Sequence, residues 1–203
     1  METERINPDE IRKVTEFHGH WCPGLAIGIR ASEWALAEMG KSPDEEIVAV
    51  VETDMCGVDA IQYLTGCTFG KGNLIHRDYG KNAFTFYRRS DGKSARLVFK
   101  TSVYGDSGRI MSRLHQKMKN SSLSPEEENQ LKKARQDVSS RIMESEPVEL
   151  FEIKEAMGPA PKKARIFNSL TCESCGEGVM ETRTRRFNDQ LLCVPCFEEL
   201  QGR

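Results

Sequence analysis

Apolar and polar residues alternate along the first three quarters of the chain in patterns that predict both strands and helices. Residues 47–51 (IVAVV) form an apolar, largely β-branched run, which predicts a buried strand. Further strands are predicted from similar runs at 74–77, 83–89, 95–101 and 148–153. Asp91 and Gly92 are predicted to form a hairpin turn, because both tolerate the positive φ angles that a tight turn requires.

Helices are predicted where apolar residues recur at helical spacing behind a capping residue. The first begins with Asn7 as its N-cap and Pro8 at its first position, and it runs into residues 17–24. Ser124 and Glu127 form a capping box at the start of another. The remaining predictions are helices at 24–39, at 58–64, from Asp106 or Ser107 to about 119, and at 125–144.

Two of these helices have faces that favour close contact with a neighbour. Small residues line one side of the helix at 24–39 and let another backbone approach closely: Gly24, Gly28, Ala31 and Ala35. The charged helix at 125–144 has only a narrow apolar seam, formed by Leu131, Ala134, Val138 and Ile142. We expect that seam to pack across a surface or against another subunit.

A change in composition near residue 158 predicts a domain boundary. The sequence GPAPKK at 158–163 is typical of a linker, because glycine and proline interrupt regular structure. We therefore predict an N-terminal domain at 1–157, a linker at 158–168 and a small C-terminal domain at 169–203.

Composition and charge narrow the class of protein. The hydrophobic fraction of 38% and the charged fraction of 30% are typical of a folded globular protein. The formal net charge is −2, so the chain as a whole is not suited to nucleic acid or an anionic membrane. The chain contains neither an apolar run long enough to span a membrane nor the pattern of a signal peptide, so we expect a cytoplasmic protein.

Four cysteines near the C-terminus have the spacing of a zinc site. Two C-x-x-C pairs, Cys172 with Cys175 and Cys193 with Cys196, can place four thiolates around one tetrahedral ion. Such a site is closed and structural, and metal binding supplies the folding energy of so short a segment. The pattern predicts a treble-clef or ribbon-like zinc finger with a hairpin turn at 188–189. Two disulfides are the alternative, which a cytoplasmic location disfavours.

Basic residues gather around this predicted finger: Lys162, Lys163, Arg165, Arg183, Arg185 and Arg186. A phosphate-binding face is one interpretation, and a zinc-finger regulator of transcription is the function that it suggests. A solvated hairpin that docks onto protein is the favoured interpretation, so nucleic acid is not an expected partner.

The segment HGHWCPG at 18–24 concentrates chemically active side chains. In an extended segment, His18, His20 and Cys22 share one face, whereas in a helix only His18 and Cys22 do. Imidazole and thiolate are ligands for zinc and other transition metals. A functional site is therefore favoured over a buried loop with hydrogen-bonded histidines and a packed cysteine.

Four motifs occur in an order that resembles the family of the formylmethanofuran dehydrogenase E subunit. They are HGHWCPG at 18–24, ETDMCGVDA at 52–60, TGCTFGKGNL at 65–74 and DYGK at 78–81. The resemblance covers residues 15 to 105, and the C-terminal finger resembles an extra module that some members carry.

This resemblance implies an α+β domain, in which the predicted helices pack on a small mixed or antiparallel sheet. It also implies association with an oxidoreductase that reduces carbon dioxide to a formyl group on methanofuran, using a molybdenum or tungsten pterin and iron–sulfur clusters. The first domain lacks the four-cysteine spacing of an iron–sulfur site. We therefore interpret the chain as an accessory subunit or a stand-alone relative, with catalysis left open.

The resemblance further implies a metal site built from the histidine and cysteine motifs. The predicted ligands are His18, His20, Cys22 and Cys56, and Cys67 is either a further ligand or a nearby thiol. Zinc suits such a mixed nitrogen and sulfur site, and three protein ligands would leave a position open for water or substrate. Cys22, Cys56 and Lys71 are the candidate catalytic residues. Asp54 or Asp59 is expected to orient a histidine, and Lys71 and Lys81 to attract an anion.

A second hypothesis is a protein–protein adaptor. In that case the N-terminal site is structural, and the finger and the helix at 125–144 bind a partner or a second copy. A homodimer and subunits of an oxidoreductase are the expected partners.

Overall fold

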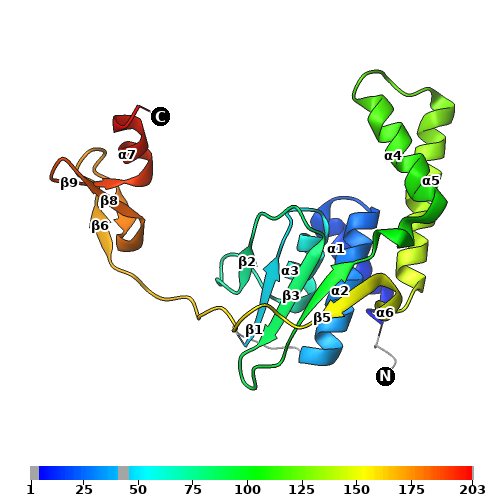
Figure 1. The fold of residues 1–203 in the computed structure, drawn as a ribbon, viewed down its shortest axis with the longest axis horizontal. Coiled ribbons are helices and arrows are strands. Elements are labelled where there is room, and N and C mark those ends of the chain that lie inside the picture. The colour runs from blue at the N-terminus through cyan, green and yellow to red at the C-terminus, as the bar shows by residue number, and fades with distance from the viewer. Residues whose placement is uncertain (1–4, 41–45, 203) are drawn as a thin grey trace. The chain divides into compact units, whose positions relative to one another are not determined.

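The computed structural model describes residues 5–40 and 46–202. The chain divides into two compact units, Met1–Lys163 and Ala164–Arg203. The first unit carries the long helices and the larger sheet, and the second carries short strands and one short helix (Figure 1).

The first unit contains both helices and strands. Its elements are α1 (Pro8–His18), α2 (Pro23–Met39), β1 (Ile47–Val51), α3 (Gly57–Thr65), β2 (Leu74–His76), β3 (Ala83–Arg88), β4 (Ser94–Phe99), η1 (Thr101–Tyr104), α4 (Gly105–Met118), α5 (Pro125–Glu144), α6 (Pro147–Leu150) and β5 (Phe151–Lys154). Asn7 caps α1 by accepting the Glu10 N–H, and Ser124 and Glu127 form the predicted capping box of α5.

The sheet of this unit is mixed, in the order β2-β1-β3-β4-β5. Strands β1 and β2 are parallel, and every other neighbouring pair is antiparallel. The predicted α+β class is confirmed. A turn that contains Asp91 and Gly92 joins β3 to β4 as the sequence predicts, but of these two residues only Gly92 has a positive φ, at 75°.

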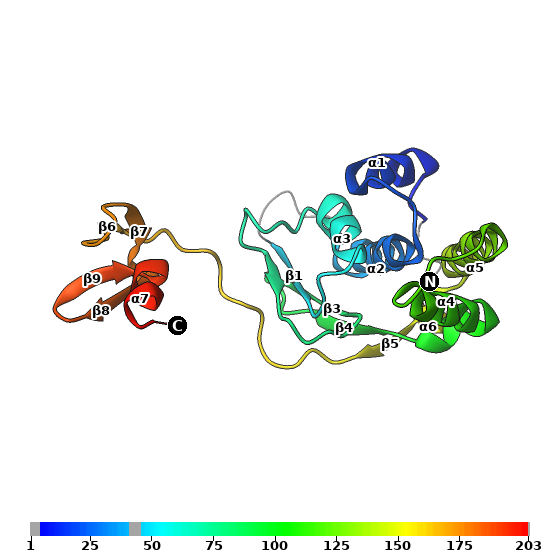
Figure 2. The ribbon, with the colours of Figure 1, turned by 90° about the horizontal axis from the view of Figure 1, so that it is seen from above.

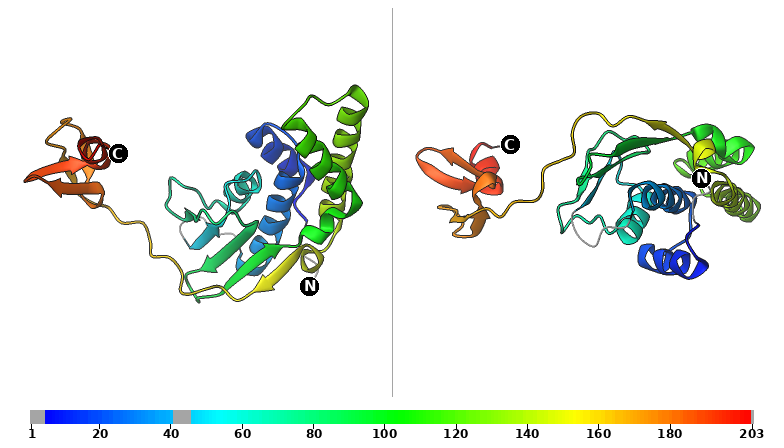
Figure 3. Two further views of the ribbon diagram at one scale, coloured as in Figure 1. Left: turned by 45° about the horizontal axis from the view of Figure 1, so that its top comes forward. Right: turned by 90° about the horizontal axis from the view of Figure 1, so that it is seen from below.

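Side-chain alternation along the strands separates the two faces of the sheet. On one face Ala49, Phe84 and Phe86 pack under α2 and α3 in the main hydrophobic core. Helix α1 lies outside these two helices, where Val14 packs with Leu25 (Figures 2 and 3). The C-terminus of α1 and the N-termini of α2 and α3 therefore lie close together on one side of the sheet.

The opposite face of the sheet is covered by the segment that follows β5. Val48, Val50 and Tyr87 pack there against Ala156 and Ala160. Ala160, which lies in the predicted linker, therefore contributes to the packing of the first unit.

Three elements differ from the sequence prediction by more than one residue at a boundary. The strand predicted at 148–153 is the single turn α6 followed by β5, because Pro147 occupies a helix N-terminus and Glu149 caps the Glu146 N–H. The strand predicted at 95–101 ends at Phe99, where η1 follows. Helix α4 begins at Gly105 without a side-chain cap from either predicted residue.

The narrow apolar seam of α5 is covered within the same chain. Leu131, Ala134, Val138 and Ile142 are all buried, and α5 packs against both α2 and α4. This seam is therefore not left free for a second subunit.

The second unit contains two short hairpins and a helix. Strands β6 (Ser169–Thr171) and β7 (Gly178–Met180) pair, as do β8 (Thr184–Phe187) and β9 (Gln190–Cys193), and α7 (Val194–Leu200) follows. Asn188 and Asp189 form the predicted turn at φ 48° and 62°. The buried core is as small as the sequence indicates, formed by Leu192 with Cys172 and Cys193.

Within the described ranges, no helix combines the length and the apolar character needed to cross a membrane.

Candidate metal centre

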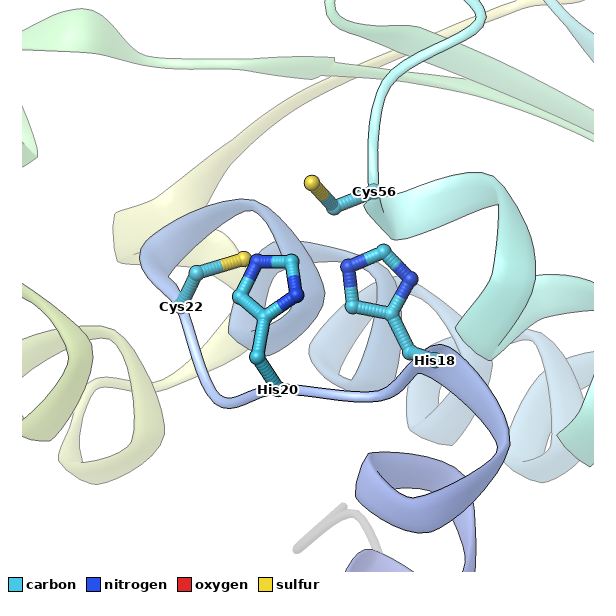
Figure 4. Close-up of side chains that lie close together, drawn as sticks. All are labelled: His18, His20, Cys22 and Cys56. Atoms are coloured by element: carbon cyan, nitrogen blue, oxygen red, sulfur yellow. The ribbon is translucent and has the colours of Figure 1, made fainter.

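Four predicted ligands of the first unit come together in space. One donor atom from each of His18, His20, Cys22 and Cys56 lies within 4.8 Å of the others. Figure 4 shows the four side chains turned toward one another. His18 ends α1, His20 and Cys22 lie on the connection to α2, and Cys56 lies just before α3.

Local backbone geometry aims the first three of these side chains. Gly19 ends α1 in the left-handed conformation at φ 91°, where a residue without Cβ is favoured, and the chain turns sharply there. Cys22 is the N-cap of α2 in an extended conformation, and its Sγ accepts the Leu25 N–H at 3.4 Å. Pro23 at the first helical position fixes where α2 begins.

Glycines bring Cys56 to this loop. A Cβ on Gly28 would lie 2.1 Å from the Gly57 carbonyl oxygen, and a Cβ on Gly57 would lie 2.9 Å from the Gly24 carbonyl oxygen. Helices α2 and α3 therefore pack backbone to backbone, as the small-residue stripe predicts. A Cβ on Gly24 would meet both Cys56 and Cys22, so the same close approach sets the two thiols beside each other.

Asp59 holds the ring of His18 in one orientation. Its Oδ2 lies 2.7 Å from His18 Nδ1. Because a carboxylate accepts hydrogen bonds, Nδ1 is the donor of this contact, and Nε2 is the nitrogen that is free to bind a metal ion. His18 Nε2 is buried and has no hydrogen-bond partner among the described residues. A buried nitrogen with a free lone pair, backed by a carboxylate, is the usual arrangement of a metal-binding histidine. The expectation for Asp59 is confirmed, whereas Asp54 is exposed.

The thiols of Cys22 and Cys56 lie side by side, and this affects the pKa of Cys56. Burial raises the pKa of Cys56 above its ordinary value, and the neighbouring Cys22 thiol raises it further. A divalent ion bound to both would lower this pKa, because it stabilises the thiolate form. The donor set therefore fits a bound metal ion.

Cys67 does not belong to this group. Its side chain is fully buried in the main hydrophobic core, and its Sγ lies 3.4 Å from the carbonyl oxygen of Ile47. The prediction that it is a ligand or a thiol near the site is corrected, because helix α3 carries Cys56 to one end and the following loop turns Cys67 toward the sheet.

The two predicted lysines have partners of their own. Lys71 Nζ donates to the Gly66 carbonyl oxygen at 2.7 Å, which satisfies the C-terminal end of α3. This contact supports a structural role for Lys71 rather than the expected catalytic one. Lys81 Nζ lies 5.9 Å from the centre of the Tyr79 ring.

A buried ion pair that the sequence does not reveal fixes the strand end before Cys56. Arg96 donates to both carboxylate oxygens of Glu52, at 2.6 and 2.7 Å. The hydrogen bonds from Arg96 lower the pKa of Glu52. The two residues are far apart in the chain. They come together because β1 and β4 lie on either side of β3 in the sheet.

The second unit contains the other cluster. Donor atoms of Cys172, Cys175, Cys193 and Cys196 lie within 4.8 Å of one another, and all four cysteines are free of disulfides. Hydrogen bonds from the backbone N–H groups of Cys175 and Cys193 lower the pKa of Cys172 to about 6. This is the four-thiolate arrangement of a closed structural zinc site.

Comparison with known proteins identifies the first unit. The family model described as FmdE, molybdenum formylmethanofuran dehydrogenase operon, matches residues 17–152. The chain belongs to the FmdE family. The match extends well beyond the region of motif resemblance and includes α4, α5 and part of β5.

A second family model, the prokaryotic dksA/traR C4-type zinc finger, matches residues 165–202. It supports the predicted structural zinc in the second unit of this FmdE-family chain.

Two further proteins are similar to this chain over most of its length. A protein of Archaeoglobus fulgidus named "Probable S-adenosyl-L-methionine-binding protein" is 32% identical over 95% of this chain, which spans 55% of that relative's length. A crystal structure of an FmdE-like protein from Syntrophus aciditrophicus, whose name refers to tungsten formylmethanofuran dehydrogenase, is 23% identical. The similarity covers 94% of this chain and 91% of the solved chain, with a TM-score of 0.63. The likeness shows a common fold.

Proposed function

We propose that the first unit binds one metal ion through His18, His20, Cys22 and Cys56. The observation that supports this most directly is the convergence of four donors of the right chemistry within 4.8 Å, reached from two separate segments. The buried, unpartnered Nε2 of His18 adds an independent argument, because such an atom is costly unless it has a ligand.

Zinc is the ion that we propose for this site. Two imidazoles and two thiolates are a common tetrahedral donor set for zinc, with donor separations of about 3.3 to 3.8 Å. His20 is exposed, whereas His18 is mostly covered, so His20 is the ligand best placed to exchange for water or substrate. A zinc ion with such an open position activates a bound water or polarises a carbonyl group.

Metal content of substituted full-length proteins tests this function. We expect two ions per chain in the wild-type protein and one in Cys22→Ser and in Cys56→Ser, because each loses a thiolate ligand. Cys67→Ser is the matched control, since Cys67 lies outside the cluster, and it should retain two. If Cys22→Ser and Cys56→Ser also retained two ions, the proposed site would be rejected.

A second candidate function is contact with another protein at the same end of the unit. The rings of Phe17 and Tyr63 are in tilted contact there, with centroids 5.6 Å apart, and both are exposed. Two large apolar side chains next to proposed ligands in the sequence, Trp21 and Met55, are exposed as well. Such a concentration favours a binding surface. A second copy of the chain and oxidoreductase subunits are the partners that we propose.

Light scattering tests for the homodimer, and co-purification tests for binding of oxidoreductase subunits. A homodimer should have twice the monomer mass, and Phe17→Ser with Tyr63→Ser should reduce it to the monomer mass while leaving both metal ions bound. A monomer at every concentration would exclude the homodimer.

The name of the Archaeoglobus relative supplies one ligand to test, S-adenosyl-L-methionine. Equilibrium dialysis with the labelled compound should show one molecule retained per chain if this chain shares that property. Lack of retention by the full-length protein would reject it.

A further inference from the structure

A cavity lies beside the candidate metal centre without including any of its four proposed ligands. Its volume is about 760 Å³, and it is formed by Trp21 of the α1–α2 connection together with α4, α5 and the loop between them. A cavity of this size accommodates an organic molecule of ordinary metabolite or cofactor size. Since Trp21 is flanked by His20 and Cys22 in the chain, an occupant would touch the loop that carries two of the proposed ligands.

The lining combines an apolar wall with exposed cationic side chains. Trp21, Met118, Leu123 and Leu131 supply the apolar wall. Trp21 is 40% exposed and Met118 is 52% exposed, so part of this wall faces solvent in the free protein. Large apolar side chains that remain exposed in a concave site favour binding of an apolar or aromatic group.

Two cations of α5, Lys132 and Arg135, also line the cavity, together with one carboxylate, Glu128. Neither cation forms an ion pair within residues 5–40 and 46–202. This differs from the neighbouring cation of α4, because Lys117 pairs with Glu127 at 2.7 Å.

Arg135 has a hydrogen-bond partner that is not a carboxylate. Its Nη2 lies 2.9 Å from Nε2 of His115, and because a guanidinium can only donate, the histidine nitrogen is the acceptor. One donor of Arg135 is used in this way, and the charge stays uncompensated. The remaining donors of the guanidinium can bind a carboxylate in the bidentate geometry that arginine favours.

We propose that this cavity binds a small organic carboxylate with an aromatic or apolar body. The carboxylate binds Arg135 and Lys132, and the body packs on Trp21 and Leu131. The inference goes beyond the metal site and does not rest on it, since none of the cavity's residues is a proposed metal ligand.

The test uses the full-length protein and the aromatic anion 8-anilinonaphthalene-1-sulfonate as a fluorescent probe. Both tryptophans lie in the first unit, and Trp21 lines the cavity whereas Trp34 packs against the core. We expect energy transfer from Trp21 to the bound probe, with most of this signal lost in Trp21→Phe. 2-Naphthoate should displace the probe, and the neutral 2-naphthalenemethanol should displace it at least about tenfold less well, because it lacks the charge that Arg135 binds.

Arg135→Gln should weaken binding of 2-naphthoate by about tenfold or more, since a charge-assisted hydrogen bond is lost. Lys133→Gln is the matched control, because Lys133 is also an exposed cation of α5 and does not line the cavity. It should change binding by less than about twofold, as expected for a screened surface charge. Metal content should be the same in both variants, so failure of this proposal is distinguishable from failure of the metal site.

Three results would overturn the proposal. The first is equal affinity of Arg135→Gln and wild-type protein for 2-naphthoate, and the second is equal displacement by the neutral alcohol. The third is a homodimer, seen by light scattering, that does not bind the probe and that dissociates when Arg135→Gln is introduced. This result would mean that a second copy of the chain occupies the cavity. Circular dichroism of each variant establishes that it is folded before its affinity is compared.

Discussion

Asp59 is the residue that decides which nitrogen of His18 faces the candidate metal centre. The contact of 2.7 Å between its Oδ2 and His18 Nδ1 holds the ring and leaves Nε2 free. A carboxylate behind a histidine also makes the imidazole a better metal ligand. The orientation of this one ring thus depends on a residue 41 positions away in the chain.

Asp59→Asn should lower the affinity of the first unit for zinc by about 10- to 100-fold, because the amide keeps the size of the side chain and loses its charge. Competition with a chromophoric zinc chelator measures this affinity. Asp54→Asn is the control, since Asp54 is exposed and none of the four proposed ligands contacts it in the described structure. Equal affinities of the two variants would show that Asp59 does not support a metal ligand.

Glu52 and Arg96 form a buried contact whose strength depends on pH. Arg96 lowers the pKa of Glu52 in the folded state, so the pair stabilises the fold above the unfolded pKa of Glu52, near 4.5. That stabilisation is lost as the pH falls through the lower folded pKa. Removing one partner of a buried pair also leaves the other charge uncompensated.

Glu52→Gln should therefore lower the free energy of unfolding by about 3 kcal/mol at pH 7, and the difference from wild type should shrink below about pH 4. Urea unfolding followed by tryptophan fluorescence reports on the first unit, which contains both tryptophans. Glu16→Gln removes an exposed pair with Arg12 and should cost less than about 1 kcal/mol. A deficit for Glu52→Gln that is equal at pH 7 and pH 3.5 would contradict the assignment.

At the scale of elements, the contact between α2 and α3 builds the candidate site. Gly28 and Gly57 let the two helices approach backbone to backbone, and this approach places Cys56 beside Cys22. The site therefore depends on two residues that have no side chain and no chemistry of their own.

Gly28→Ala should destabilise the first unit by about 1 to 3 kcal/mol or more, because its Cβ would lie 2.1 Å from the Gly57 carbonyl oxygen and force the helices apart. It should also weaken metal binding, since Cys56 moves with α3. Gly70→Ala is the control, because nothing lies within 4 Å of its Cβ. Thermal unfolding and metal content measure both effects, and a wild-type melting temperature for Gly28→Ala would contradict the close packing.

At the scale of the whole molecule, the chain combines two compact units, and each contains a cluster of residues that could hold a metal ion. The first unit has an extended hydrophobic core and would fold around its site, whereas the second buries little more than Leu192 and its own cysteines. Metal binding is therefore a larger fraction of the folding energy in the second unit.

A chain that ends at Lys163 should remain folded and retain one of the two metal ions. A strong chelator should unfold residues 164–203 of the full-length protein and leave the first unit folded. Amide resonances, or circular dichroism of the full-length and truncated chains, would measure this. If the truncated chain bound no metal even when zinc is supplied, the metal site proposed in the first unit would be rejected. The structural zinc of the second unit would then be the only site still supported.

The sequence alone determined the features that depend on residues close together in the chain. The caps of α1 and α5, the strand at 47–51, the turn at 188–189 and the two C-x-x-C pairs are of this kind. It also indicated His18, His20 and Cys22 as candidate ligands, because they lie within five residues, and the family resemblance added Cys56 to them. The turn α6 was missed because the apolar residues at 148–153 resemble a strand more than the start of a helix.

Only the tertiary structure decided which distant residues join those local features. It brought Cys56 to the histidines, turned Cys67 into the core, paired Glu52 with Arg96 and opened the cavity beside Trp21. Sequence spacing carries no information on these contacts, because they depend on which faces of the helices and strands pack together. In the sequence, Arg135 is likewise one of many charged residues on its helix. Its place in the cavity follows only from the packing that brings Trp21 to the same cavity.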